Sequence, residues 1–332
     1  MKVGVIGCGL IGSKRADSIR SSYIKACFDN NTRSAKIFSK KYDCNLCTNE
    51  KDFFNVELDL VIISVTHDQL TKYAIKALKK NCHILIEKPG GISSNDLLII
   101  KKLSKIKKLS VKIGFNHRYL DCFRKLKEIY AKLKKKDELM FIKASYGHGG
   151  RKNYEKEWRF NIKKSGGGEL IDQGSHLIDI CIWLLKEIHV DYSTLHDYFW
   201  KKGIEDNVFL ILKTNSNQVI QLHTSWTEWK NSFRFELYMK KSKILIDGIG
   251  KSYGEQRLVF YNMNKSMKPP VIKEYKFKSN DNSWRKETME FINSIKQKRF
   301  LNESLDDCIK LNKLILSAYK KNAGKKILYN YK

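Results

Sequence analysis

Hydrophobic positions in the first third of the chain follow two periods. From residue 2 to about residue 115, short aliphatic and β-branched runs alternate with longer stretches where apolar side chains recur every three or four positions, as in 70–78. The short runs predict five strands, at residues 3–6, 23–28, 60–65, 83–86 and 111–115. Strands that alternate with helices are typical of βαβ units, so this part predicts a Rossmann fold with a doubly wound parallel sheet.

The pattern changes after a basic helical stretch at about 120–133. A long helical segment follows, and then come strands at 208–212, 219–223 and 233–238. This order predicts an α+β domain built on a largely antiparallel sheet. We therefore expect an α/β protein of two domains, a nucleotide-binding domain at 1–118 and a substrate-binding, catalytic domain at 119–332. No Gly/Ser tract separates them, so the domains are expected to pack closely.

The composition fits a globular protein. Hydrophobic residues make up 42% of the 332 residues, and no apolar run approaches the ~20 residues of a membrane span. The first residues read as a strand and not as an export signal, so we expect a cytoplasmic protein whose eight cysteines are reduced. Cys44 and Cys47 have the spacing of half a zinc site, but no second pair supplies the other ligands, so no metal is expected.

The formal net charge of +29 raises the question of nucleic-acid binding. Lysines far outnumber arginines and occur in helical stretches such as 101–108, where they would line a solvated face. Bidentate recognition of bases and phosphates favours arginine instead. The sequence therefore favours a lysine-rich surface without a specific nucleic-acid partner, and any attraction to polyanions should be weak and sensitive to salt.

A glycine-rich turn follows the first strand and opens a helix. Three glycines in the order GxGxxG suit a tight turn, a close approach of pyrophosphate and helix–strand packing. The residues expected to hold a dinucleotide here are Gly7, Gly9, Leu10, Ile11 and Gly12. Asp29 ends the second strand, where a carboxylate accepts from the ribose hydroxyls and repels a 2′-phosphate, so NAD is preferred over NADP. The alternative role for Asp29 is that of a turn residue beside Asn30 and Asn31.

Glu87 and Lys88 end the strand at 83–86, at the carboxyl edge of the predicted sheet, where open α/β folds bind ligands. We expect both beside the cofactor, although Lys88 has the alternative of being one more surface lysine.

Further on, three glycines at 166–168 lead into a helix that places Asp172 and His176 on one face with Asp179 and Trp183, while its other face is apolar. The polar face is expected to line a cleft.

These residues suit the oxidation of an alcohol. Histidine titrates near working pH, so His176 is the expected base, Lys88 supplies positive charge, and Asp172 is expected to bond the substrate hydroxyl and keep the lysine protonated. The alternative for His176 is a buried histidine satisfied by Asp179.

Three motifs resemble those of the glucose-fructose oxidoreductase and inositol dehydrogenase (Gfo/Idh/MocA) family: the glycines at 7–12, Glu87-Lys88-Pro89, and the GGGxxxDxGxHxxD run at 166–179. The resemblance covers nearly the whole chain and implies that Lys88, Asp172 and His176 are catalytic. It further implies that four residues lie near the substrate, namely Asn116, Arg118, Trp158 and Arg159. The segments 146–151 and 226–230 resemble bacterial sugar-pathway members associated with surface polysaccharides.

The sequence thus predicts an NAD-dependent oxidoreductase that acts on a secondary alcohol or ketone of a sugar or nucleotide sugar. The alternatives are NAD-assisted glycoside cleavage and a non-catalytic NAD- and sugar-binding regulator. Cationic contacts to an anionic substrate are expected from Arg118, Arg151 and Arg159, while Trp226 and Trp229 either stack on a sugar or belong to the core. We expect a homo-oligomer, a dimer or tetramer, with no membrane partner.

Overall fold

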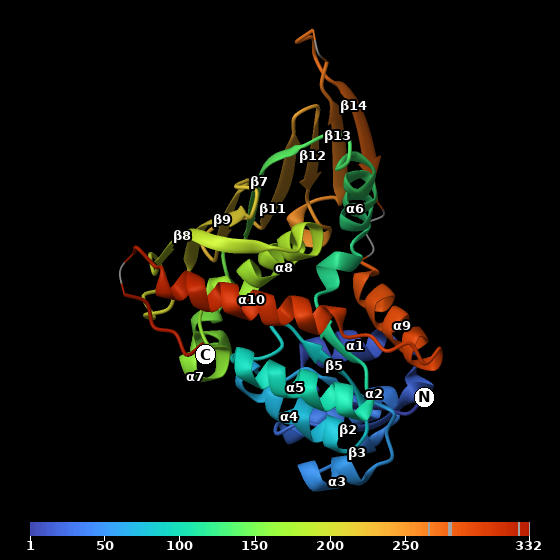
Figure 1. The fold of residues 1–332 in the computed structure, drawn as a ribbon. Coiled ribbons are helices and arrows are strands. Elements are labelled where there is room, and N and C mark those ends of the chain that lie inside the picture. The colour runs from blue at the N-terminus through green and yellow to red at the C-terminus, as the bar shows by residue number, and fades with distance from the viewer. Residues whose placement is uncertain (265, 278–280, 325, 332) are drawn as a thin grey trace.

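The computed structural model describes residues 1–264, 266–277, 281–324 and 326–331, and it contains two β-sheets one above the other (Figure 1). The first sheet has six parallel strands in the order β3-β2-β1-β4-β5-β6, as a Rossmann domain requires. Its strands are β1 (Val3–Ile6), β2 (Ile24–Phe28), β3 (Asn45–Leu46), β4 (Leu60–Ile63), β5 (His83–Glu87) and β6 (Val111–Gly114). Its helices are α1 (Leu10–Asp17), α2 (Thr32–Tyr42), α3 (Glu50–Asn55), α4 (His67–Lys79) and α5 (Ser94–Lys107).

The five predicted strands of this sheet are confirmed. The sequence pattern missed β3, because two residues at the edge of a sheet are too short to show a period. The strands β1, β4 and β5 are buried over almost their whole length, since helices cover both faces.

The second sheet has eight strands in the order β14-β13-β12-β11-β7-β10-β9-β8, and only the β7–β10 pair is parallel. The predicted largely antiparallel sheet is therefore confirmed. Its strands are β7 (Leu139–Gly147), β8 (Ile188–His196), β9 (Asn207–Thr214), β10 (Val219–Ser225), β11 (Ser232–Met239), β12 (Ser242–Asp247), β13 (Arg257–Asn262) and β14 (Val271–Lys276). The remaining helices are α6 (Asp121–Leu133), α7 (Ile162–Ser165), α8 (Ser175–Leu185), α9 (Ser283–Lys296) and α10 (Glu303–Lys320).

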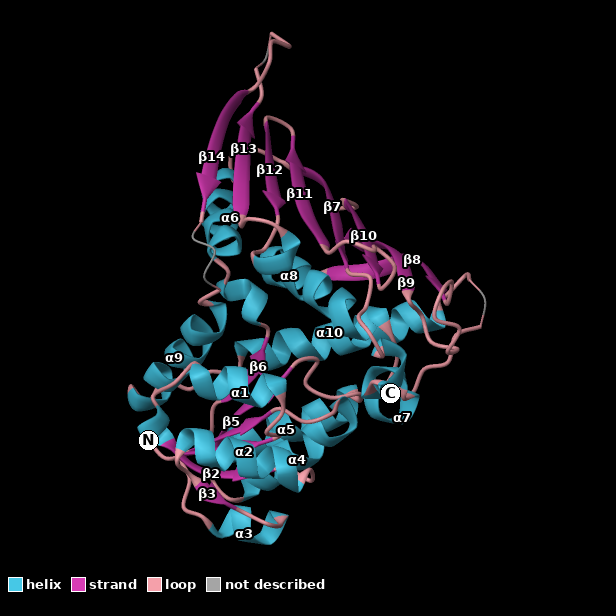
Figure 2. Cartoon of the chain, turned by 180° about the vertical axis from the view of Figure 1, so that it is seen from behind, coloured by secondary structure: helices cyan, strands magenta, loops and turns pink. Residues whose placement is uncertain are grey.

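Two C-terminal helices join the sheets. Helix α10 runs between them, where it packs against α8 on one side and against α5 and β6 on the other (Figures 1 and 2). Helix α9 packs against α1, and Phe291 and Ile292 of α9 complete the apolar core on that face of the first sheet. The last part of the chain thus returns to the nucleotide-binding half, and the boundary between residues 118 and 119 stays a prediction.

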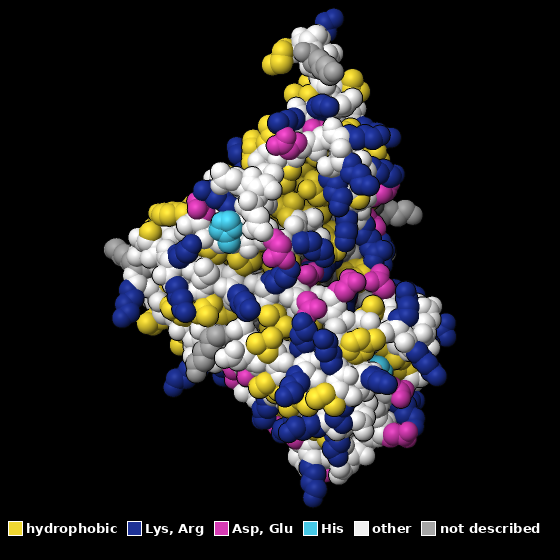
Figure 3. All heavy atoms as spheres, viewed as in Figure 1, with side chains coloured by type: hydrophobic (Ala, Val, Ile, Leu, Met, Phe, Trp, Pro, Cys, Tyr) yellow, Lys and Arg dark blue, Asp and Glu magenta, His cyan; other side chains and the backbone are white. Residues whose placement is uncertain are grey.

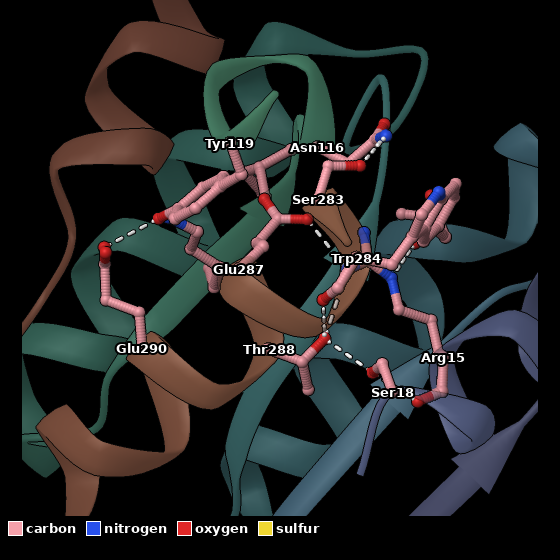
Figure 4. Close-up of polar contacts among 12 residues, drawn as sticks. Arg15, Ser18, Asn116, Tyr119, Ser283, Trp284, Glu287, Thr288 and Glu290 are labelled. Atoms are coloured by element: carbon pink, nitrogen blue, oxygen red, sulfur yellow. Dashed lines mark hydrogen bonds and ion pairs between the residues drawn. The ribbon is translucent and has the colours of Figure 1, made fainter. Parts of the chain in front are cut away.

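The α1–α9 contact contains a buried ion-pair network, shown in Figure 4. The Arg15 side chain is fully buried, pairs with Glu87 and with Glu287 at 2.5 and 2.7 Å, and stacks on the ring of Trp284 at 4.4 Å. A buried guanidinium requires such partners, because an unpaired charge away from water is strongly destabilising. The network ties α9 to α1 and to the end of β5.

One end of the second sheet faces the first domain. The loop after β7, the β8–β9 loop and the β10–β11 loop lie together at that end, since Gly147 pairs with both Ser225 and Ser232, and Ser225 pairs with Asn207. Helix α7 and the start of α8 lie on the same side (Figures 1 and 2). The loop after β7 reaches the carboxyl end of β5, because its Arg159 pairs with Asp172, the partner of Lys88.

Lysine and arginine side chains are spread over both domains on the face in Figure 3 and do not gather into one stripe there. Within the described ranges, no helix has the length and apolar character needed to cross a membrane. All eight cysteines are free, and seven of them are buried.

Candidate active site

The glycine-rich loop has the shape that a dinucleotide needs. Gly7 has φ +92°, and a Cβ there would lie 2.3 Å from the carbonyl oxygen of Ser64. A Cβ on Gly12 would lie 1.9 Å from the carbonyl oxygen of Gly7, so both positions exclude a side chain. Gly9, by contrast, faces open space. The first and third glycines therefore allow the turn to close, and the second leaves room for a phosphate.

The start of α1 is free to bind an anion. Gly9 is its N-cap and supplies no side-chain acceptor, so the first backbone N–H groups of the helix are available to pyrophosphate. The side chain of Leu10 is exposed at this point. The residues present thus fit NAD, and the backbone of residues 9–12 would hold its pyrophosphate.

Asp29 has the contacts of a turn residue. Its Oδ2 accepts from the backbone N–H of Cys8 at 2.7 Å and braces the glycine loop, while its Oδ1 accepts from the N–H of Asn31. Each oxygen keeps a lone pair that a ribose hydroxyl could use. The contact of Asp29 with the ribose, and the repulsion of a 2′-phosphate, stay predictions.

We expect the double substitution Asp29→Ser and Asn30→Arg to lower the affinity for NAD(H) by ~10-fold or more and to shift the preference toward NADP(H). A hydrogen bond to a charged group is worth ~1.5–3 kcal/mol, and the new arginine offers a partner to the 2′-phosphate. Calorimetric titration with both cofactors measures the change. Asp43→Ser, an exposed aspartate at the end of α2, is the matched control, and wild-type affinity for NADP(H) equal to that for NAD(H) would contradict the assignment.

The side chain of Glu87 is used by a contact within the protein. Its carboxylate accepts from Arg15, and burial raises its pKa above the ordinary range for glutamate. The contacts present therefore assign Glu87 to the α1–α9 network, and its predicted contact with the cofactor stays a prediction.

Lys88 and Asp172 form the centre of the site. The Lys88 ammonium donates to Oδ1 of Asp172 at 2.8 Å and to the carbonyl oxygen of the same residue at 2.6 Å. Burial alone would raise the pKa of Asp172, but the charges of Lys88 and Arg159 hold it well below its usual range. Lys88 is thus not one more surface lysine, because only 17% of its side chain is exposed and it bridges the two domains.

His176 lies one helical turn beyond Asp172 and is a neutral imidazole. Burial, together with His117 and Lys88, lowers the pKa of His176 well below its usual range. Its Nδ1 is buried and has no hydrogen-bond partner among the described residues. Asp179 does not satisfy it, since both oxygens of Asp179 accept from Arg118. The buried histidine satisfied by Asp179 is therefore not what the structure shows.

His117 is a neighbour that the sequence analysis missed. Its ring stacks on that of His176 with 4.0 Å between centroids and an angle of 21°, and burial lowers its pKa to about 4. It precedes Arg118 on the short helix after β6, so no local period links it to His176. Only its proximity to the motif residues Asn116 and Arg118 could have drawn attention to it.

A second missed histidine supports Trp158. His67, at the start of α4, places its Nδ1 2.9 Å from the carbonyl oxygen of Ser165 and packs edge-on to Trp158 at 4.8 Å. Burial lowers its pKa to about 3, so the ring is neutral and Nδ1 donates. Its position after β4, at the carboxyl edge of a parallel sheet, was the available signal.

Two arginines continue the polar network outward. Arg159 donates from Nε to Asp172 Oδ2 at 3.0 Å and from Nη1 to Glu157 at 2.8 Å. Glu157 in turn pairs with Arg151, whose side chain is 58% exposed. The groups Lys88, Asp172, Arg159, Glu157 and Arg151 thus form a chain of alternating charge from the centre of the site to the surface.

Arg118 and Asn116 lie deeper. The Arg118 guanidinium pairs with Asp179 at 2.6 and 2.7 Å and with Asp307 of α10 at 2.9 Å. Burial raises the pKa of Asp179 to about 6 in spite of this partner. Asn116 donates to the hydroxyl of Ser283 at 2.9 Å (Figure 4). These contacts are structural, and the contact of both residues with substrate stays a prediction.

Only part of the polar face predicted for α8 lies at the site. Asp172 and His176 lie at the site, whereas Asp179 is buried under Arg118 and the ring of Trp183 lies beneath the ammonium of Lys127 at 3.9 Å. Residues 170–174 form a π-helical turn before α8 and not a regular α-helix. That turn directs both the carbonyl and the carboxylate of Asp172 at Lys88.

The three glycines at 166–168 are required by close packing. A Cβ on Gly167 would lie 1.9 Å from the Tyr319 hydroxyl, and one on Gly168 would lie 2.2 Å from the carbonyl oxygen of Glu205. The buried Oε1 of Glu205 accepts from the N–H groups of Gly168 and Leu170 and from the Tyr319 hydroxyl. Glu205 thus anchors the turn that carries Asp172, and no motif in the sequence had pointed to this residue.

Trp226 and Trp229 have different roles. Trp226 is fully buried in a hydrophobic cluster with Tyr154 and Ile204, so it belongs to the core. Trp229 is 69% exposed. Among the described residues, no group of three or more His, Cys, Asp or Glu side chains could hold a metal ion.

The glycine loop suits a dinucleotide, and the pairing of Lys88 with Asp172 beside the buried His176 brings ionisable side chains together at the carboxyl end of β5. Residues 1–115 match the oxidoreductase family with an NAD-binding Rossmann fold, and residues 123–245 match the Gfo/Idh/MocA C-terminal domain. The chain belongs to the Gfo/Idh/MocA family of NAD-binding oxidoreductases.

Similar proteins include glucose-6-phosphate 3-dehydrogenase of Bacillus subtilis strain 168, which is 29% identical over 192 residues, covering 56% of this chain and 54% of the relative. Inositol 2-dehydrogenase of Salmonella typhimurium strain LT2 is 26% identical over 234 residues, covering 65% and 64%. The match thus spans between about half and two thirds of these relatives. The solved UDP-N-acetylglucosamine 3-dehydrogenase of Acidithiobacillus ferrooxidans shares the fold, with TM-score 0.79, 15% identity and 97% of each chain covered.

Proposed function

We propose that this protein is an NAD-dependent dehydrogenase or reductase that acts on a secondary alcohol or ketone of a sugar. The observation that supports the proposal best is the pairing of Lys88 with Asp172 beside a neutral His176, where the carboxyl end of β5 meets α8. A dehydrogenase needs a base for the hydroxyl proton and a positive charge for the developing alkoxide. Here the hydrogen bonds to Asp172 hold Lys88, and stacking on His117 holds His176.

Bound NAD supplies the acceptor for the hydride. Neutral His176 takes the hydroxyl proton at a ring nitrogen, and the Lys88 ammonium stabilises negative charge on the substrate oxygen. Asp172 fixes the position of the Lys88 ammonium, while Arg159 holds the second oxygen of Asp172. In the reverse direction, protonated His176 returns the proton to the oxygen of the ketone.

The finer assignments are also proposals. We propose a phosphorylated or nucleotide-linked sugar as the substrate and a role in surface-polysaccharide synthesis, supported by Arg151 at the surface end of the polar chain and by the anionic sugar named for the Bacillus relative. Free cysteines fit a cytoplasmic protein, and we propose a homo-oligomer. Arg118 and Arg159 are mostly buried and each pairs with two carboxylates. Arg151 is 58% exposed and pairs with Glu157 alone, so it is the proposed cationic contact.

The test is a panel of neutral, phosphorylated and nucleotide-linked sugars, read by NADH formation with NAD and by NADH consumption with the matching keto sugars. We expect net NADH formation with at least one anionic sugar. Cleavage of a glycoside without net NADH formation would support the glycoside-cleaving alternative instead. Binding of NAD and sugar without either reaction would support the non-catalytic regulator.

The pH dependence follows from the neutral His176. Its pKa lies well below the ordinary histidine range, so the base is already deprotonated at neutrality, and protonation at lower pH removes it. We therefore expect kcat for alcohol oxidation to stay level from neutral pH down through pH ~6.5 and to fall only below that. Measurement of kcat against pH tests this, and a decline centred at the ordinary histidine pKa would contradict it.

A further inference from the structure

Exposed aromatic side chains gather at the loop end of the second sheet. Phe199 on the β8–β9 loop is 51% exposed, and Trp229 on the β10–β11 loop is 69% exposed. Their rings meet edge to face, with 4.9 Å between centroids and an interplanar angle of 87°. Two loops far apart in the sequence thus present one aromatic surface, here called the aromatic platform.

The platform is held rigidly although it faces solvent. Trp229 has φ +55°, a conformation that a bulky residue rarely adopts, and residues in such conformations cluster at ligand sites. Its backbone is packed against the loop after β7 so closely that a Cβ on Gly149 would lie 2.8 Å from Trp229 Cα. The core does not use this indole, whereas it does bury Trp226 three residues earlier. The backbone is fixed and the ring is left free for a ligand.

The platform is continuous with the proposed active site. Gly149 packs on Trp229, a Cβ on Gly150 would meet the ring of Trp200 at 2.6 Å, and the next residue is Arg151. Arg151 is the outer end of the chain of alternating charge that reaches Asp172 and Lys88. A substrate with its reacting sugar at Lys88 would extend outward along this chain to the platform.

The surroundings of the platform are cationic. Arg151 is 58% exposed and uses Nη2 for Glu157, so the guanidinium keeps donors for an anion. Lys201 and Lys202 on the β8–β9 loop and Lys230 next to Trp229 are exposed. Aromatic rings that stack on bases, next to cations that pair with phosphates, are the combination by which proteins hold nucleotides.

We propose that Trp229 and Phe199 form a stacking subsite for the base of a nucleoside diphosphate attached to the sugar, and that Arg151 pairs with the diphosphate. The inference rests on the proposed function, because it assigns the outer part of the same substrate. A neutral free sugar would leave these cations unused, whereas the negative diphosphate of a nucleotide sugar matches them. Every nucleobase offers a flat face, so the platform gives the class of ligand and not the identity of the base.

The test uses the whole protein saturated with NAD, so that nucleotides do not enter the cofactor site. UDP, dTDP, CDP, GDP and inorganic pyrophosphate are titrated by calorimetry. Stacking of one base is worth a factor of roughly 5 to 150 in affinity, so at least one nucleotide should bind ~10-fold or more tightly than pyrophosphate. Trp229→Ala should bring that nucleotide down to the affinity of pyrophosphate, and Trp229→Phe should keep most of the difference.

Two further variants separate stacking from charge. Arg151→Gln should weaken nucleotide and pyrophosphate alike, whereas Phe300→Ala, an exposed aromatic between α9 and α10, should change neither. The proposal is overturned if no nucleotide binds more tightly than pyrophosphate or if Trp229→Ala leaves the nucleotide affinity unchanged. It is also overturned if Trp229→Ala alters only the sedimentation of the protein, since a second copy would then cover the platform.

Failure of the subsite and failure of the proposed function give different results. If the wild-type protein reduces NAD with a neutral sugar and Trp229→Ala reacts equally well with every nucleotide sugar, the subsite is wrong and the oxidoreductase stands. If nucleotides bind in a Trp229-dependent manner but no sugar is oxidised and no keto sugar is reduced, the subsite stands and the oxidoreductase assignment is wrong.

Discussion

We expect His176→Ala to lower kcat by ~10²–10⁴-fold while leaving NAD binding nearly unchanged, because a general acid–base group contributes about this much and His176 is not part of the glycine loop. The matched control is His189→Ala, an exposed histidine on β8, which should keep the wild-type rate. Steady-state kinetics on the true substrate and calorimetric titration with NAD provide the two measurements. Unchanged turnover in His176→Ala would remove this residue from the mechanism.

Lys88→Ala should reduce the rate to a similar extent, because it removes the charge that stabilises the substrate oxygen. It also leaves the partly buried Asp172 carboxylate with Arg159 as its remaining cation, so its effect on the pH profile should exceed that of a surface lysine. Asp172→Asn keeps the shape and loses the charge, so it should change the rate and its pH dependence more than NAD affinity. Exposed Lys105 supplies the control, as Lys105→Ala.

The second large effect concerns stability. We expect Arg118→Met to lower the free energy of unfolding by ~3–5 kcal/mol, because it leaves Asp179 and Asp307 as buried carboxylates without their cation. Arg124→Met breaks an exposed pair with Glu290 and should cost at most ~1 kcal/mol. Urea-induced unfolding of both variants measures the difference. An unchanged midpoint for Arg118→Met together with a raised KM would show instead that Arg118 binds substrate.

The ion pairs of Arg118 could not be predicted from the sequence. The sequence placed Arg118 and Asp179 in separate motifs and assigned the arginine to the substrate. In the fold, Arg118 follows β6 and lies directly beneath α8. Asp307 comes from α10, which is more than a hundred residues further along the chain. A charge pair between distant segments leaves no periodic signal in either segment, so only the packing of α8 and α10 reveals it.

The different burial of Trp226 and Trp229 could not be predicted from the sequence either. Trp226 and Trp229 lie three residues apart on one loop, and the sequence left both a core position and a ligand contact open for each of them. Their burial differs because different residues pack against them. Tyr154 and Ile204 enclose the side chain of Trp226, whereas Gly149 contacts only the backbone of Trp229. The contacts come from the loop after β7 and the β8–β9 loop, so residue type alone could not distinguish the two positions.

The sequence by itself determined the parts whose chemistry is local. Gly7, Gly9 and Gly12 specify the turn and the anion-binding helix start, because backbone conformation and the absence of Cβ are properties of consecutive residues. The Lys88 and His176 motifs identified, by residue type, the groups that we propose react. Only the tertiary structure decided that His117 stacks on His176, that Glu205 anchors the turn of Asp172, and that Arg159 serves a carboxylate. These contacts join segments far apart in the chain, and burial, which sets the protonation state of His176, exists only once those segments have packed.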